Sequence, residues 1–199
     1  MSTLRVILAS ASPRRRDLLD LIGIPHVVQP ADIDESVREA ESPAAYVERL
    51  AREKAAAVAR LHPEAIIIAA DTTVVRDGTI LGKPTDDADA AQMISSLAGR
   101  AHTVCTGMAV QRGTHVASAV EQVDVTFRSL TAAEIAAYVA TGEPRDKAGA
   151  YGIQGYGATI VERIEGDYFS VMGLGLRRVV QLLAAVGVRY DFAHGLTPD

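Results

Sequence analysis

Residues 65–75 read AIIIAADTTVV, and this stretch indicates the fold class. Its three consecutive isoleucines, Ile66 to Ile68, are β-branched and apolar, which predicts a core strand. Asp71 follows the apolar run and is expected at the carboxyl end of that strand. Val74-Val75 continues the strand, and Asp77-Gly78 is a tight-turn signal that returns the chain to Ile80-Leu81. We therefore expect a buried strand that delivers a carboxylate to one edge of a sheet.

Short apolar runs alternate with helical patterns on both sides of this strand. Residues 4–9 predict a buried strand, which leads through the polar turn Ser10–Pro13 into a helix from Arg14 to Ile22. This alternation predicts an α/β fold, a mixed central sheet flanked by helices, in one domain over residues 1–199. The other expected elements are a strand near 26–30, a helix capped by Ser42 that reaches about Arg60, a helix from Asp86 to Leu97, strands at 102–110 and 116–127, a helix from Thr131 that stops at Gly142, a strand near 158–163, a helix from about 174 to 186, and a loose tail from Tyr190.

Charge and composition narrow the function classes. The 199 residues contain 20 Lys and Arg against 25 Asp and Glu, a net charge of −5. Nucleic-acid binding draws on positive charge and aromatic stacking, and this chain is acidic, 5% aromatic and without Trp. The single cysteine, Cys105, fits a reducing compartment. With no secretory pattern and no long apolar run, we expect a cytoplasmic protein that binds neither nucleic acid nor membrane.

Three basic sites along the chain, an arginine cluster and two lysines, point to a small polyanion. Arg14 and Arg15 begin a helix directly after a serine-rich turn that includes Ser10. Free amides at a helix N-terminus and arginine side chains both suit phosphate oxygens. Lys54 falls on the apolar side of its helix, which is unusual for a solvated lysine, and Lys83 lies in the loop Gly82-Lys83-Pro84. A plain solvated face is the alternative, which we accept for the neighbouring third arginine.

Carboxylates supply the acidic counterpart. A lone Asp71 after an apolar strand is unfavourable unless it is paired, bound to a metal or open to a cleft. Asp32, Asp34 and Glu35 add oxygen ligands of the kind that Mg²⁺ or Mn²⁺ prefers; taken alone, such an acidic loop is more often plain solvated surface. Two structural alternatives stay open for Asp71, which could cap a turn or pair with Lys54.

The glycine-rich segment 146–157 could bring backbone close to a ligand. Gln154 lies within it, and a glutamine amide carries both a donor and an acceptor edge. Those edges match the N3–H and O4 of uracil or thymine, while a flipped amide would serve cytosine. By contrast, His102 is expected to be a structural histidine with its hydrogen bonds satisfied, and Cys105 a small buried side chain.

Six motifs are spread over most of the chain: LASASPRRRDLL at 8–19, ESPAAYVERLAREKA at 41–55, AADTTVV at 69–75, GKP at 82–84, DKAGAYGIQG at 146–155 and GDYFSVMGL at 166–174. Together they resemble the Maf-family nucleotide pyrophosphatases, the septum-formation-inhibitor-like proteins. The form of residues 146–155 resembles the branch of the family that acts on dTTP and UTP. Two positions depart from the family pattern, Thr73 and Gly175, where an apolar residue and a proline are usual.

The resemblance implies a fold, a reaction and a site. The fold would be an elongated α/β body with a central cleft, similar to inosine triphosphatases and often a homodimer. The enzyme would cleave a nucleoside triphosphate between the α and β phosphates with a divalent metal, removing unwanted or modified nucleotides. The implied roles are proton acceptor for Asp71, base specificity for Arg14, Thr72 and Gln154, triphosphate binding for Ser10, Arg15, Lys54 and Lys83, and metal binding for Asp71 and Glu35.

Two other functions remain open at this stage. The same chemistry could act on other or modified bases. Alternatively, the chain could sense nucleotides or take part in septum control without turnover. A nucleotide panel separates these possibilities.

Overall fold

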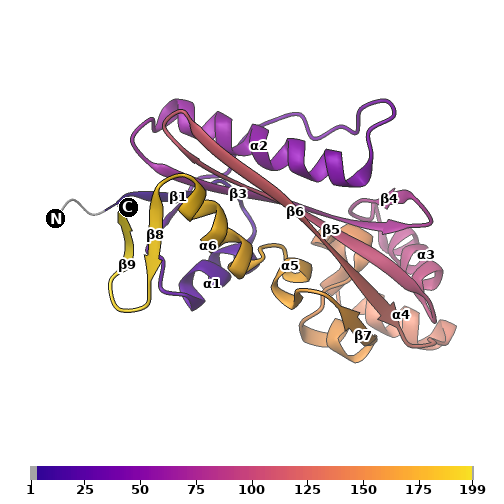
Figure 1. The fold of residues 1–199 in the computed structure, drawn as a ribbon. Helices are drawn as coiled ribbons and strands as arrows, with labels where there is room; N and C mark the ends of the chain where they lie inside the picture. Colours follow the sequence, from indigo (N-terminus) through magenta and orange to yellow (C-terminus); the bar gives the residue numbers. More distant parts are fainter. Residues whose placement is uncertain (1–3, 199) are drawn as a thin grey trace. The chain divides into compact units, whose positions relative to one another are not determined.

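A computed structural model describes residues 4–198 of the chain (Figure 1). Strands and helices alternate along it. Seven strands form one sheet of order β2-β1-β3-β5-β6-β7, in which β4 also pairs with β3. The strands are β1 Val6–Leu8, β2 Val27–Val28, β3 Ile66–Arg76, β4 Thr79–Leu81, β5 Ala101–Arg112, β6 His115–Phe127, β7 Val161–Glu165, β8 Val188–Asp191 and β9 Gly195–Pro198. The helices are α1 Pro13–Leu21, α2 Pro43–Leu61, α3 Asp87–Leu97, α4 Ala132–Ala140, α5 Tyr168–Met172 and α6 Leu176–Ala185, with short 3₁₀ helices η1 Glu143–Asp146, η2 Ala148–Ala150 and η3 Gly155–Thr159.

The sheet is mixed, as predicted. β1 runs parallel to both β2 and β3, with Ile7 paired to Val27 on one side and Ile67 on the other. β4 returns antiparallel to β3, and β7 runs antiparallel to β6. The α/β class predicted from the alternation of apolar runs is therefore confirmed.

The chain forms two compact units. Unit 1 comprises residues 1–71, 106–121 and 173–199, and unit 2 comprises residues 72–105 and 122–172. The chain passes between them within β3, β5 and β6, and again directly after α5. A single functional domain over residues 1–199 stays a prediction.

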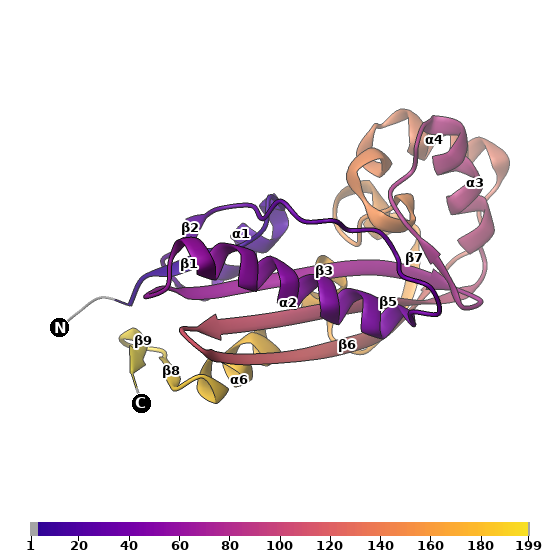
Figure 2. The same ribbon diagram turned by 90° about the horizontal axis from the view of Figure 1, so that it is seen from above.

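Helices cover both faces of the sheet in unit 1. α2 lies along one face of β1 and β3, and α1 and α6 lie against the other (Figures 1 and 2). The α2 side is a close contact, because an added Cβ on Gly107 would overlap the backbone of Val47. Small residues allow this approach. The residues that share this core are Ile7, Ala9, Ala51, Ala55, Val58, Ala59, Ala65, Ile67, Ala69 and Ala109.

Unit 2 has its own core beneath α3 and α4. Phe127, fully buried on β6, meets His102 and Tyr151 edge-on, with ring centroids 4.9 and 4.6 Å away. His102 Nε2 also lies 2.7 Å from the Tyr151 hydroxyl. His102 is thus buried in the core, as expected of a structural histidine, but the expectation that it would be fully hydrogen-bonded was wrong, because its Nδ1 has no partner within residues 4–198. Cys105 is buried as well.

The buried imidazole makes unit 2 sensitive to acid. Burial lowers the pKa of His102 to about 4, because the charged form loses its hydration. The unfolded value is about 6.5, so neutral His102 stabilises the fold above that pH, and this stability is lost as pH falls toward 4. We expect the free energy of unfolding to fall by about 2 kcal/mol from this group between pH 7 and pH 5. Denaturant unfolding at both pH values checks this, since His102→Gln should remove that part of the change; an equal change in the variant would contradict it.

Two sequence expectations were wrong. Asp71 is not at the carboxyl end of its strand but lies inside β3, which continues through Val74 and Val75, as predicted, to Arg76. The partner strand β1 is the one that ends early, opposite Ile68, so Asp71 still lies beyond the parallel pairing. The tail from Tyr190 is not loose: β8 and β9 pair as a hairpin, and the Tyr190 hydroxyl donates to the Ile22 carbonyl at 2.7 Å. That bond spans most of the chain and leaves no local pattern.

Smaller differences concern element boundaries. The short helix α5 was not anticipated, and β7 begins three residues later than expected because η3 occupies residues 155–159. Among residues 4–198, no helix combines the length and apolar character that crossing a membrane would need.

Candidate active site

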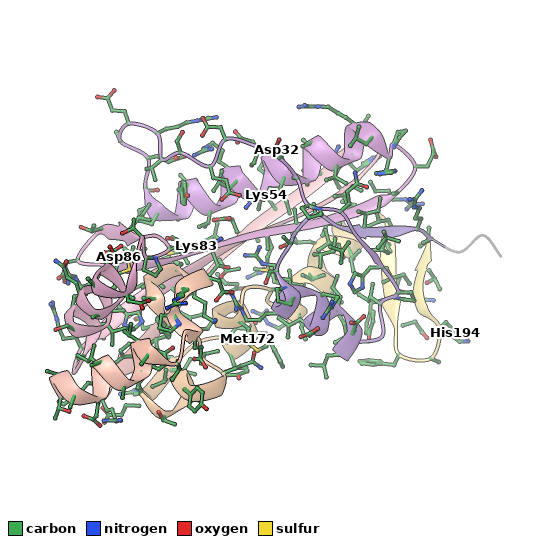
Figure 3. The ribbon with its side chains drawn as sticks, turned by 180° about the vertical axis from the view of Figure 1, so that it is seen from behind. Asp32, Lys54, Lys83, Asp86, Met172 and His194 are labelled. Carbon is green, nitrogen blue, oxygen red and sulfur yellow. The ribbon has the colours of Figure 1, made fainter. Side chains whose placement is uncertain are left out.

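A buried lysine lies between two carboxylates in unit 1. Lys54 projects from α2 (Figure 3), and its residue is only 7% exposed. Its Nζ donates to Asp71 Oδ1 at 2.7 Å and lies 2.7 Å from Glu35 Oε1. Asp71 is buried on β3, whereas Glu35 is exposed on the loop before α2. The predicted site residues on the helix, the strand and the acidic loop therefore meet.

The turn between β1 and α1 adds a hydroxyl and a guanidinium. Ser10 Oγ accepts from the Ser12 amide at 3.2 Å and from Arg15 Nη1 at 3.0 Å. Arg15 Nε donates to the Gly173 carbonyl at 2.8 Å, which fixes the orientation of the guanidinium. Burial lowers the pKa of Arg15, while the charges of Asp71 and Glu35 oppose that shift. Arg15 thus lies within electrostatic range of both carboxylates.

Two α2 side chains hold the loop that carries Glu35. Arg49 makes a two-point contact with Glu41, at 2.6 and 2.7 Å, and donates to the Ser36 carbonyl at 3.0 Å. The Tyr46 hydroxyl donates to the Glu35 carbonyl at 3.0 Å. The Arg49 hydrogen bonds lower the pKa of Glu41 to about 2. Sequence reasoning missed these supports, because their partners lie on two separate stretches of chain.

The rest of the acidic loop does not join the cluster through any contact in the described structure. Asp34 is exposed, and its Oδ1 accepts from the Ser36 amide at 2.9 Å, which lowers its pKa. Asp32 is also exposed. Across residues 4–198 no group of three or more His, Cys, Asp or Glu side chains could form a metal site on its own. Glu35 is thus the one acidic-loop residue paired with Lys54 in the described range.

The other predicted site residues are placed as follows. Arg14 is half-buried in the first turn of α1, in unit 1. Thr72 follows Asp71 in β3 and is half-buried, and Lys83 is exposed in the loop after β4 (Figure 3). Gln154 is exposed between η2 and η3. The last three belong to unit 2.

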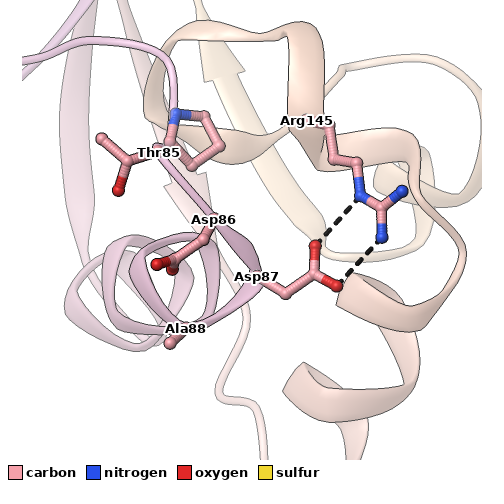
Figure 4. A pocket seen from close by; sticks show the side chains of 6 residues that line it. Thr85, Asp86, Asp87, Ala88 and Arg145 are labelled. Atoms are coloured by element: carbon pink, nitrogen blue, oxygen red, sulfur yellow. Dashed lines mark hydrogen bonds and ion pairs between the residues drawn. The ribbon is translucent and has the colours of Figure 1, made fainter.

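A shallow pocket near the start of α3 was not predicted. Its main polar feature is a two-point ion pair between Arg145 and Asp87, with both distances 3.0 Å (Figure 4). Asp86 caps α3 by accepting from the Asp89 amide at 2.8 Å. Arg145 and Asp87 neutralise each other, while the Asp86 carboxylate is used as the helix cap. The ion pair links residues 58 positions apart, which no local signal reveals.

Known proteins agree with the motif pattern. The family model described as Maf-like protein matches residues 5–186. The chain belongs to the Maf-like protein family. It is 56% identical over 191 residues to the dTTP/UTP pyrophosphatase of Moorella thermoacetica, covering 92% of this chain and 96% of that one. It is 51% identical to the protein of the same description from Symbiobacterium thermophilum, covering 92% and 94%.

Among solved structures, this Maf-like protein resembles the Staphylococcus aureus Ham1 protein with a TM-score of 0.49 and 14% identity, over 79% of each chain. In unit 1 of this Maf-like protein, a carboxylate on β3, a lysine on α2 and an arginine on α1 lie within electrostatic range of one another. Such a set can bind phosphate oxygens and accept a proton from water.

Proposed function

We propose that this Maf-like protein hydrolyses nucleoside triphosphates, dTTP and UTP above all, to the monophosphate and pyrophosphate. The observation that carries the proposal is the contact of buried Lys54 with Asp71 and Glu35, each at 2.7 Å. Asp71 pairs with Lys54, as its structural alternative also predicts, but the same Nζ contacts a second carboxylate, Glu35, from an exposed loop. The names of the relatives, at 56% and 51% identity, support the same reaction.

The reaction needs a nucleophile, a proton acceptor and a stabilised leaving group. A water oxygen forms the new bond to the α-phosphorus, and the bond from that phosphorus to the bridging oxygen breaks. Asp71 accepts the proton of the water, and pyrophosphate leaves with the bonding electrons. In this proposal Ser10, Arg15, Lys54 and Lys83 bind the phosphate oxygens and stabilise the charge on the leaving group.

A divalent cation fits this donor set. Mg²⁺ is usually held by one or two carboxylates together with substrate phosphates, and Mn²⁺ accepts similar oxygen ligands. Asp71 and Glu35 supply two carboxylates on a common lysine, and the described part of the chain holds no larger cluster. These two residues would hold the cation beside the nucleotide. When bound, it would polarise the phosphoryl group and favour ionisation of water.

Base selection is assigned to Gln154, Arg14 and Thr72. The Gln154 amide can donate to O4 and accept from N3–H of uracil or thymine. The same chemistry on a modified pyrimidine stays within this proposal. A cytoplasmic location and a homodimer, which the family resemblance implies, complete it.

The test is pyrophosphate release from a panel of nucleoside triphosphates with Mg²⁺ or Mn²⁺, and again with EDTA. We expect metal-dependent release that is strongest with dTTP and UTP. Strongest release from another base would retain the reaction and reject the assignment of Gln154. Binding without release from any nucleotide would reject the enzyme in favour of a nucleotide sensor.

A further inference from the structure

Gln154 belongs to unit 2, and its side chain is exposed. Within residues 4–198 its side-chain amide makes no hydrogen bond. Its backbone is extended, with φ −108° and ψ 174°, between η2 and η3. An amide on a mobile loop selects poorly between ligands, because the orientation that fits the ligand is only one of many that the loop samples. What fixes the loop is therefore part of selectivity.

A carboxylate and a phenol hold the loop on both sides of Gln154. On the C-terminal side, Glu143 accepts from the amides of Tyr156 and Gly157, each at 2.9 Å. On the N-terminal side, the Tyr138 hydroxyl accepts from the Gly152 amide at 3.3 Å. The same hydroxyl donates to Glu143 at 2.9 Å, which joins the two sides into one network.

Close packing shows that this network is built into the loop. Gly155 has φ +64°, and an added Cβ there would overlap the Glu143 carboxylate. An added Cβ on Gly157 would overlap the carbonyl oxygen of Gly152, so the loop folds back on itself. Glycine permits both the left-handed backbone and the close approach. Residues 152–157 therefore fold closely around the Glu143 carboxylate, which is more constraint than a glycine-rich loop has by itself.

The loop that carries Gln154 is attached to α4 and β5. Tyr138 lies on α4 and is 6% exposed, and burial raises the pKa of its hydroxyl, which keeps it protonated as a donor. Tyr151, which directly precedes this loop, is buried, and its hydroxyl is hydrogen-bonded to His102 Nε2 of β5 at 2.7 Å. Lys147 Nζ donates to the Glu143 carbonyl at 2.6 Å. Fixed elements thus set where the Gln154 backbone lies.

We propose that Glu143 and Tyr138 are positioning residues that set base selectivity, by holding the loop on both sides of Gln154. The inference rests on the proposed function, in which Gln154 reads a pyrimidine base. Neither residue needs to touch the base. Their effect comes from orienting the amide before the nucleotide binds, so it falls on the bases that this amide serves.

The test compares Glu143→Gln, Tyr138→Phe and Gln154→Ala in steady-state hydrolysis of UTP, dTTP, CTP and ATP. Glu143→Gln keeps the size of the side chain but replaces one acceptor oxygen with a donor, and Tyr138→Phe removes both hydroxyl bonds. We expect either variant to lower kcat/KM for UTP and dTTP about tenfold, mainly through KM, and the values for CTP and ATP by less than about threefold. When either substitution is combined with Gln154→Ala, kcat/KM for each nucleotide should match that of Gln154→Ala alone.

Glu165→Gln is the matched control, because it removes an exposed carboxylate whose ion pair among residues 4–198 is with Arg163, and it should leave selectivity unchanged. Amide hydrogen exchange supplies a readout independent of activity. Exchange at Tyr156 and Gly157 should accelerate at least about tenfold in Glu143→Gln, as expected when a charge-assisted bond is lost.

The outcomes separate this inference from the proposed function. A base-selective loss in Gln154→Ala that Glu143→Gln does not share, or that adds to it, overturns the inference while retaining the proposed function. Unchanged exchange at Tyr156 and Gly157 overturns it as well. An equal loss for every base in Gln154→Ala removes base reading by Gln154, and this inference falls with it.

Discussion

Asp71→Asn is expected to lower kcat for dTTP and UTP hydrolysis by about a thousandfold, the middle of the range for loss of a general base. Asparagine has nearly the same shape but cannot accept the proton of the attacking water. The substitution leaves Lys54 its contact with Glu35 at 2.7 Å, so the cluster retains one ion pair. Steady-state release of pyrophosphate measures the effect.

Three comparisons make the Asp71→Asn result specific. A non-hydrolysable α,β-imido analogue of UTP should still bind to the variant, because the basic side chains are unchanged. Asp77→Asn, an exposed carboxylate in the turn after the same strand, should keep wild-type kcat. Thermal denaturation of the variants reports whether they are folded. Turnover by a folded Asp71→Asn within threefold of wild type would remove Asp71 from the chemistry.

Lys54→Met is expected to impair both activity and folding. Methionine keeps much of the apolar stem of this buried side chain, but Asp71 and Glu35 lose their shared cation. Breaking a buried ion pair by removing one partner destabilises by about 3–5 kcal/mol; because Glu35 is exposed, we expect about 3 kcal/mol here. We expect kcat/KM for dTTP and UTP to fall at least about a hundredfold, the low end for lost charge stabilisation. Urea denaturation and steady-state kinetics measure the two effects.

A second pair of variants separates the two roles of Lys54. Glu35→Gln in the Lys54→Met background removes one unpaired carboxylate and should recover part of the stability but none of the activity. Lys54→Arg keeps the charge and should stay close to wild-type stability. An unfolding free energy for Lys54→Met within about 0.5 kcal/mol of wild type would show that the ion pairs do not stabilise the fold.

Local signals gave correct predictions wherever one segment decides its own structure. Ser42 accepts from the Ala45 amide at the start of α2, Asp86 caps α3, and Thr131 with Glu134 forms the predicted capping box. Each cap needs only residues within one helical turn. The apolar runs likewise located β1, β3, β5 and β6, because period and residue type are properties of a single stretch.

Long-range pairing produced the errors. The strand containing Asp71 continues past the point where the polar residues suggested an end, since sheet neighbours rather than polarity set its length. The tail that carries β8 and β9 is attached to the rest of unit 1 by the Tyr190 hydroxyl, which donates to the Ile22 carbonyl, 168 residues away. Neither partner is visible from the segment itself.

The same division applies to the candidate site. The sequence by itself determined which residue types are present: a carboxylate after the most apolar strand, a lysine on the apolar side of a helix, arginines after a serine turn and a glutamine among glycines. Only the tertiary structure decided that Lys54 lies between Asp71 and Glu35, and that Glu143 and Tyr138 fix the loop of Gln154. The physical reason is distance along the chain. Spacing specifies a helix or a strand, whereas contacts between separate elements follow from how their buried faces pack.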